Sequence, residues 1–90
     1  MKFIVKWRIP KGSVVDSEAR FLKTGAAPPA GITMIGRWHG MSGGGVLIAE
    51  TNDARALYSW LGYWNDLLEF ETTPCVDDAE AGAVLASITR

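Results

Sequence analysis

The chain has 90 residues, a net charge of −1 at neutral pH and one cysteine. Such a length suits a single domain over residues 1–90, and the balanced charge removes the attraction to phosphate backbones, so we expect no nucleic acid partner. One Cys and one His cannot form an internal disulfide or a zinc site, and we expect neither a metal nor a cofactor. Without a signal peptide or an apolar run near the roughly 20 residues of a membrane span, the chain is expected to be cytoplasmic.

The N-terminal third predicts a strand followed by a helix. Apolar residues alternate along a strand at 2–9, namely Phe3, Val5, Trp7 and Ile9. Ser13 can cap a helix that runs to about residue 23, with a buried stripe predicted at Val15, Ala19 and Leu22. Gly25 fits the left-handed position that ends such a helix.

A glycine-rich loop at 40–45 predicts a hairpin between strands 32–39 and 46–51. This loop length places His39 opposite Val46. One sheet face then holds Ile35, Arg37, His39, Val46, Ile48 and Glu50, whereas the other holds Met34, Trp38, Leu47, Ala49 and Thr51. A slip of one residue would invert this partition.

The remaining chain predicts a helix at 54–64, a strand at 67–76 and a final helix at 79–87. The first of these helices has a buried stripe predicted at Leu57, Trp60, Leu61 and Trp64, and its Gly62 suggests a close neighbour. The resulting order, β-α-β-β-α-β-α, predicts an α+β, ferredoxin-like fold with an added C-terminal helix. Its antiparallel four-stranded sheet would have the order 4-1-3-2, with both long helices on one face.

The opposite sheet face is predicted to mix apolar residues with charges, which neither an exposed nor a fully buried face normally does. Four Trp, three Phe and two Tyr are also more aromatic surface than so small a domain hides comfortably. Both observations favour a homodimer in which a second subunit covers this face.

Three segments resemble a known family. "RFLKTGAAPPAGITMIGRWHG", "GGGVLIAET" and "WLGYWNDLLEFETTPCVDD" are similar to the bacterial family labelled domain of unknown function 3303, and the run from Gly36 to His39 is the most specific piece. The resemblance implies membership of the dimeric α/β barrel group, small ferredoxin-like proteins that pair sheet to sheet. It carries over no catalytic residue.

Arg37, His39 and Glu50 are the candidate polar site, because the predicted pairing places them on one face. Arg37 would bind an anion or a carbonyl, while Glu50 would orient His39 for proton exchange, which makes His39 and Glu50 the catalytic candidates. The alternative is a cross-strand cluster that only satisfies polar groups in a dimer interface.

We therefore expect a homodimer that binds a small, partly apolar anionic molecule on the sheet face, through Arg37, Trp38, His39 and Glu50. A cofactor-independent monooxygenase or isomerase that uses His39, and a purely structural or regulatory dimer, remain alternatives. Trp60 and Trp64, one helical turn apart, could line an apolar ligand pocket, but aromatic residues at this spacing are more often core.

Overall fold

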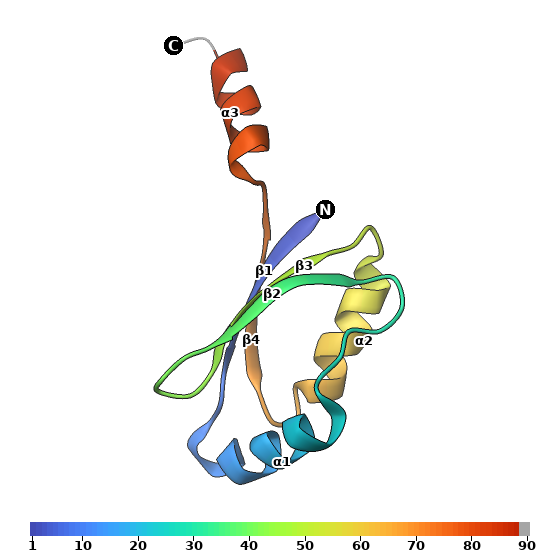
Figure 1. Ribbon diagram of the computed structural model, residues 1–90, viewed down its shortest axis with the longest axis vertical. Helices are drawn as coiled ribbons and strands as arrows, with labels where there is room; N and C mark the ends of the chain where they lie inside the picture. Colours follow the sequence, from blue (N-terminus) through green and yellow to red (C-terminus); the bar gives the residue numbers. More distant parts are fainter. Residues whose placement is uncertain (89–90) are drawn as a thin grey trace.

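The computed structural model describes residues 1–88, which fold into one four-stranded sheet and three α-helices (Figure 1). In chain order the elements are β1 (Lys2–Arg8), the 3-10 helix η1 (Lys11–Ser13), α1 (Val14–Thr24), β2 (Thr33–His39), β3 (Gly45–Glu50), α2 (Ala54–Trp64), β4 (Glu69–Cys75) and α3 (Asp78–Ser87). Every predicted element is present with only small shifts at its ends. No helix in this described part is long and apolar enough to cross a membrane.

The sheet is antiparallel and has the strand order β2-β3-β1-β4, which is the predicted order 4-1-3-2 read from the other edge. Helices α1 and α2 lie on the same side of this sheet (Figure 1). The predicted α+β, ferredoxin-like fold is therefore confirmed.

The β2–β3 hairpin differs from its prediction by one residue. His39 pairs with Gly45 and Arg37 with Leu47, so the loop spans only 40–44 and the predicted pairing of His39 with Val46 is wrong. Gly45 is a strand residue whose missing side chain leaves room for the Trp7 ring: a Cβ there would collide with that ring and with the Trp38 carbonyl. Because side chains alternate along a strand, this slip turns Arg37 and His39 toward the helices.

A β-bulge at Ile35 explains why only part of the predicted partition fails. Met34 pairs with Ala49 and Gly36 pairs with Ile48, which leaves Ile35 as the extra residue of β2. Met34 and Arg37 therefore face the helices together although they are three residues apart. The predicted sheet face is therefore correct for Met34, which precedes the bulge, and reversed for the residues of β2 that follow the bulge.

The core lies between the sheet and α2. Asp53 caps α2, accepting hydrogen bonds from the backbone N–H groups of Arg55 and Ala56 at 3.0 and 3.1 Å. The buried core residues are Val5, Ile32, Leu47, Ala49, Leu57, Trp60 and Trp64. The predicted inner stripe of α2 is thus confirmed. A Cβ added at Gly62 would meet nothing within 4 Å, so the close packing expected there is wrong.

Helix α1 presents a different face from the predicted one. Val15 and Leu22 are 78% and 83% exposed, whereas Ser17 is 4% exposed. Ser13 stands at the N-cap without a side-chain hydrogen bond, and Gly25 ends the helix with the expected left-handed φ of 69°. Two contacts favour the observed rotation of α1 about its axis: Phe21 packs against the core, and Arg20 donates two hydrogen bonds of 2.9 Å to Asp66.

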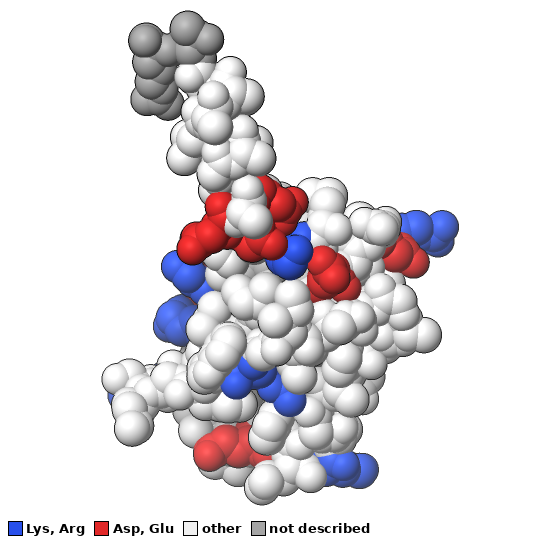
Figure 2. Space-filling model, turned by 45° about the horizontal axis from the view of Figure 1, so that its top comes forward, with Lys and Arg blue, Asp and Glu red and all other residues white. Residues whose placement is uncertain are grey.

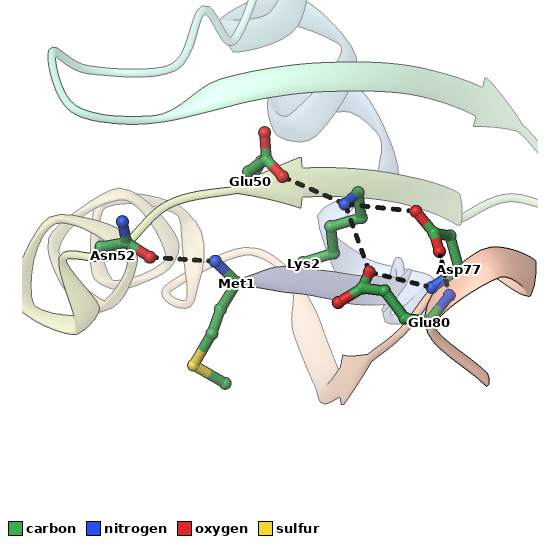
Figure 3. A network of polar contacts seen from close by, with 6 residues as sticks. All are labelled: Met1, Lys2, Glu50, Asn52, Asp77 and Glu80. Carbon is green, nitrogen blue, oxygen red and sulfur yellow. Dashed lines mark hydrogen bonds and ion pairs between the residues drawn. The ribbon is translucent and has the colours of Figure 1, made fainter. Parts of the chain in front are cut away.

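Helix α3 stands away from the sheet along the longest dimension of the molecule, 51 Å (Figure 1). Its first turn is a capping box in which Asp77 accepts from the Glu80 backbone at 2.8 Å and Glu80 accepts from the Asp77 backbone at 3.3 Å. Lys2 joins this turn to the sheet, since its Nζ lies 3.2 Å from Glu50, 3.7 Å from Asp77 and 3.6 Å from Glu80 (Figure 3). These partly exposed ion pairs therefore join the first turn of α3 to the sheet, and the helix extends away from the sheet beyond that turn (Figure 1).

The free part of α3 is apolar. Figure 2 shows acidic side chains gathered at its base and an uncharged surface beyond them. Val84 and Leu85 are 56% and 59% exposed. A helix of ten residues is marginal in water by itself, so this one lacks the tertiary packing that normally supports a helix of its length.

Candidate functional site

A cavity of about 330 Å³ lies between the sheet and the two helices α1 and α2. That volume is near the lower end of the roughly 300–1,000 Å³ typical of small-molecule sites. Its walls are mostly aromatic and aliphatic, with a few polar groups: Trp7, Ile9, Ser17, Glu18, Phe21, Leu22, Ala26, Arg37, His39, Leu47, Trp60, Leu61, Trp64, Leu68 and Phe70.

His39, the last residue of β2, is held at this cavity by two aromatic rings. Its ring meets Trp7 edge to face at 5.5 Å between centroids and Phe21 at 5.1 Å. The residue is exposed at the cavity wall, and within residues 1–88 its imidazole nitrogens have no hydrogen-bond partner. The two aromatic contacts therefore orient the ring and leave its nitrogens available to a ligand.

Arg37, two residues earlier, joins β2 to the end of α1. Its Nη1 and Nη2 donate to the backbone carbonyls of Ala26 and Gly25, both at 2.9 Å, and its guanidinium carbon lies 5.1 Å from the centre of the Phe21 ring. A cation suits this place, because the carbonyl end of a helix carries partial negative charge.

The charge of Arg37 is incompletely compensated. Partial burial lowers the pKa of the Arg37 guanidinium below its ordinary value, since desolvation disfavours the charged form. No carboxylate lies within ion-pair distance of it in the described part of the chain. Two of its five N–H groups are committed to carbonyls, so donors remain for a further acceptor.

Ser17 and Glu18 are polar residues of the cavity that the sequence prediction missed, and Ser17 is the buried one. Its Oγ is buried and has no hydrogen-bond partner among residues 1–88. It lies one helical turn before Phe21 on the inward face of α1, and this i, i+4 spacing was the available signal. The prediction overlooked it because the buried face of the helix was assigned from hydrophobicity alone, which selected Val15, Ala19 and Leu22.

Two of the predicted site residues lie on the other side of the sheet. Glu50 pairs with Lys2, so the predicted grouping of Glu50 with Arg37 and His39 is wrong, and so is the predicted orientation of His39 by Glu50. Trp38, predicted to face the helices, is 59% exposed on the opposite face, where its ring covers Gly36. The cause is the one-residue shift of the hairpin, and it leaves Arg37 and His39 as the part of the predicted set that lines the cavity.

Trp60 and Trp64 satisfy both interpretations weighed from the sequence. They are 7% and 6% exposed, as core residues should be, and both also line the cavity. The site thus combines a rigid aromatic wall from α2 with polar groups from β2 and α1.

Comparison with known proteins identifies the family. No curated protein and no solved structure matches the chain. A model of the family described as a domain of unknown function, DUF3303, matches residues 1–89. Because this match spans nearly the whole chain, the protein belongs to the DUF3303 family, as its sequence resemblance predicted.

Proposed function

We propose that the chain forms a homodimer that binds a small, largely apolar molecule bearing a carboxylate or carbonyl group, in the cavity between the sheet and α1/α2. The observation that carries this proposal is Arg37, a partly buried cation without a carboxylate partner in the described chain, beside an aromatic cavity of about 330 Å³. An anionic ligand group would compensate that charge, and Trp60 and Trp64 would bury the apolar part.

The catalytic alternative has weaker support than binding. General acid–base catalysis needs a donor or acceptor held in a defined tautomer. Glu50, the carboxylate expected to hold His39, instead pairs with Lys2 on the opposite face. His39 therefore serves in this proposal as a hydrogen-bonding group for the ligand.

Binding can be tested with phenylpropionate and its neutral amide as probes, by calorimetry or by quenching of tryptophan fluorescence. We expect the carboxylate to bind tenfold or more tightly than the amide, because hydrogen bonds to charged groups contribute about 1.5–3 kcal/mol. In Arg37→Gln this preference should disappear. Arg55→Gln is the matched control, since Arg55 is exposed on α2 and does not line this cavity.

Equal binding of acid and amide by the wild type would refute the role of Arg37, and binding of neither probe would refute the site. Arg37→Gln also weakens the link to Gly25 and Ala26. The thermal midpoint of each variant is therefore measured alongside, so that loss of binding is separated from loss of fold.

The dimer part of the proposal rests on the open face, meaning the sheet face opposite to α1 and α2. Ile4, Val46, Ile48 and Trp38 lie there among charged residues that pair with one another. Lys2 contacts Glu50 at 3.2 Å, Arg8 donates from Nε to Glu69 at 3.0 Å, and Lys6 lies opposite Glu71. A face whose charges cancel in this way can meet its own copy without net repulsion, and α3 exposes a second apolar surface on the same chain.

Sedimentation equilibrium tests the dimer. We expect twice the 9.8 kDa of one chain for the wild type, and a shift toward the single mass for Trp38→Glu and Leu85→Glu. Tyr58→Glu is the matched control, because Tyr58 is 80% exposed on α2, away from the open face and α3. A single-chain mass for the wild type at all concentrations would refute the dimer but not the cavity.

A further inference from the structure

The cavity holds a buried hydroxyl that the proposed function does not use. Ser17 is 4% exposed, lines the cavity, and its Oγ has no hydrogen-bond partner among residues 1–88. Buried hydroxyls in native proteins are nearly always satisfied, because an unpaired one loses its hydration without compensation. A ligand in the cavity can thus supply the hydrogen bond that this hydroxyl lacks.

The helix geometry sets the distance between this hydroxyl and the cationic end of the cavity. Ser17 and Phe21 lie on one face of α1, about 6 Å apart along the helix axis. The Phe21 ring contacts both Arg37 and His39, each at 5.1 Å. Ser17 and the pair Arg37 and His39 therefore lie on either side of the Phe21 ring, and Trp60 and Trp64 line the same cavity.

We infer that Ser17 is a second polar anchor and that the ligand class is an aromatic or cyclic acid with a hydroxyl, carbonyl or amino group at the end remote from its carboxylate. This inference rests on the proposed function, since it takes Arg37 and His39 as the site of the anionic end. The ligand spans the cavity, with its ring against α2 and its distal polar group hydrogen-bonded to Ser17 Oγ. A purely apolar tail would leave that oxygen unpaired, so the site discriminates against it.

The test compares phenylpropionate with its para- and meta-hydroxy derivatives, on the wild type and on Ser17→Ala. We expect at least one hydroxylated acid to bind the wild type about five to ten times more tightly than phenylpropionate, as one added hydrogen bond provides. In Ser17→Ala the preference should fall to about one while phenylpropionate binds as before. Ser59→Ala, an exposed serine on α2 outside this cavity, should keep the preference.

The thermal midpoint separates this role from a structural one. If Ser17 is an orphan, Ser17→Ala should leave the midpoint unchanged or raise it, whereas a hydroxyl that supports the helix would lower it on removal. Phenylpropionate binding without any hydroxyl preference, or a preference that survives in Ser17→Ala, would overturn the inference and leave the proposed function standing. Failure of all three acids to bind would overturn both.

Discussion

Replacement of Gly45 by alanine tests the hairpin register that turns Arg37 and His39 toward the cavity. A Cβ at Gly45 would lie 2.6 and 2.7 Å from two atoms of the Trp7 ring and would also meet the Trp38 carbonyl. Ordinary carbon contacts are about 3.5–4.0 Å, so the ring must move by about 1 Å. Overpacking of this kind costs about 1–3 kcal/mol, and the upper end applies because a backbone atom is also in the way.

The expected loss of 3 kcal/mol corresponds to a fall in thermal midpoint of about 12–24 °C, at 4–8 °C per kcal/mol for a chain of this size. Thermal and urea unfolding followed by far-UV circular dichroism would measure it at fixed protein concentration. His39 adds a local probe, since it is the only histidine and its ring meets Trp7 at 5.5 Å. Its ring-proton chemical shifts should change when the Trp7 ring moves.

The matched control is Gly62→Ala in the last turn of α2, where nothing lies within 4 Å of the added Cβ. Alanine is favoured over glycine inside a helix, so this variant should gain about 1 kcal/mol. Opposite signs for the two glycines are the expected result. A Gly45→Ala variant within 0.5 kcal/mol of the wild type, on the order of an ordinary surface substitution, would refute the register.

Two further predictions concern helix caps. Asp53→Ala should lower the free energy of unfolding by about 1 kcal/mol in urea titrations, because the backbone N–H groups of Arg55 and Ala56 lose their acceptor, while Asp53→Asn should retain most of it. The backbone N–H of Glu80, and more weakly Lys2, hold the pKa of Asp77 below its usual 3.8. The contribution of this cap to the stability of α3 is therefore full above pH 3.8 and is lost as the pH falls through the lowered pKa. The resonance of the Asp77 carboxyl carbon should report its own titration directly in an NMR experiment. A midpoint at or above the usual value would contradict the direction of the shift.

The fold could be predicted from local signals because each of them acts over a few residues. Three such signals each identify an element independently of the others. They are the alternation of apolar residues along β1, the helix stop at Gly25, and the i, i+3, i+4, i+7 stripe of α2 formed by Leu57, Trp60, Leu61 and Trp64. Short connections then leave few topologies for six elements in the order β-α-β-β-α-β. An error of one or two residues at the end of an element does not alter such an argument.

The site could not be predicted as reliably, because a face assignment fails with an error of one residue. Whether Gly45 belongs to the loop or to β3 depends on the Trp7 ring, which reaches it from a strand 38 positions earlier in the sequence. The bulge at Ile35 had one local signal, the adjacent Gly36, because a glycine inside a strand often marks a bulge. That signal alone does not say which residue is the extra one. The hairpin register and the position of the bulge both depend on long-range packing, and together they determine which sheet face Arg37 and His39 occupy.

The inversion also separates the two proposed functions, ligand binding and dimer formation, that the sequence prediction placed on one face. With Arg37, His39 and Glu50 on a single face, ligand and partner subunit would have competed for the same surface. In the structure Glu50 instead joins Lys2 at the base of α3, on the open face, while Arg37 and His39 line the cavity under α1. A variant of the open face should therefore lower the mass measured by sedimentation without altering the binding of an aromatic acid, and a variant of the cavity should weaken binding without altering that mass. A change in both quantities from a single variant would show that the two sites are thermodynamically linked and would contradict their separation.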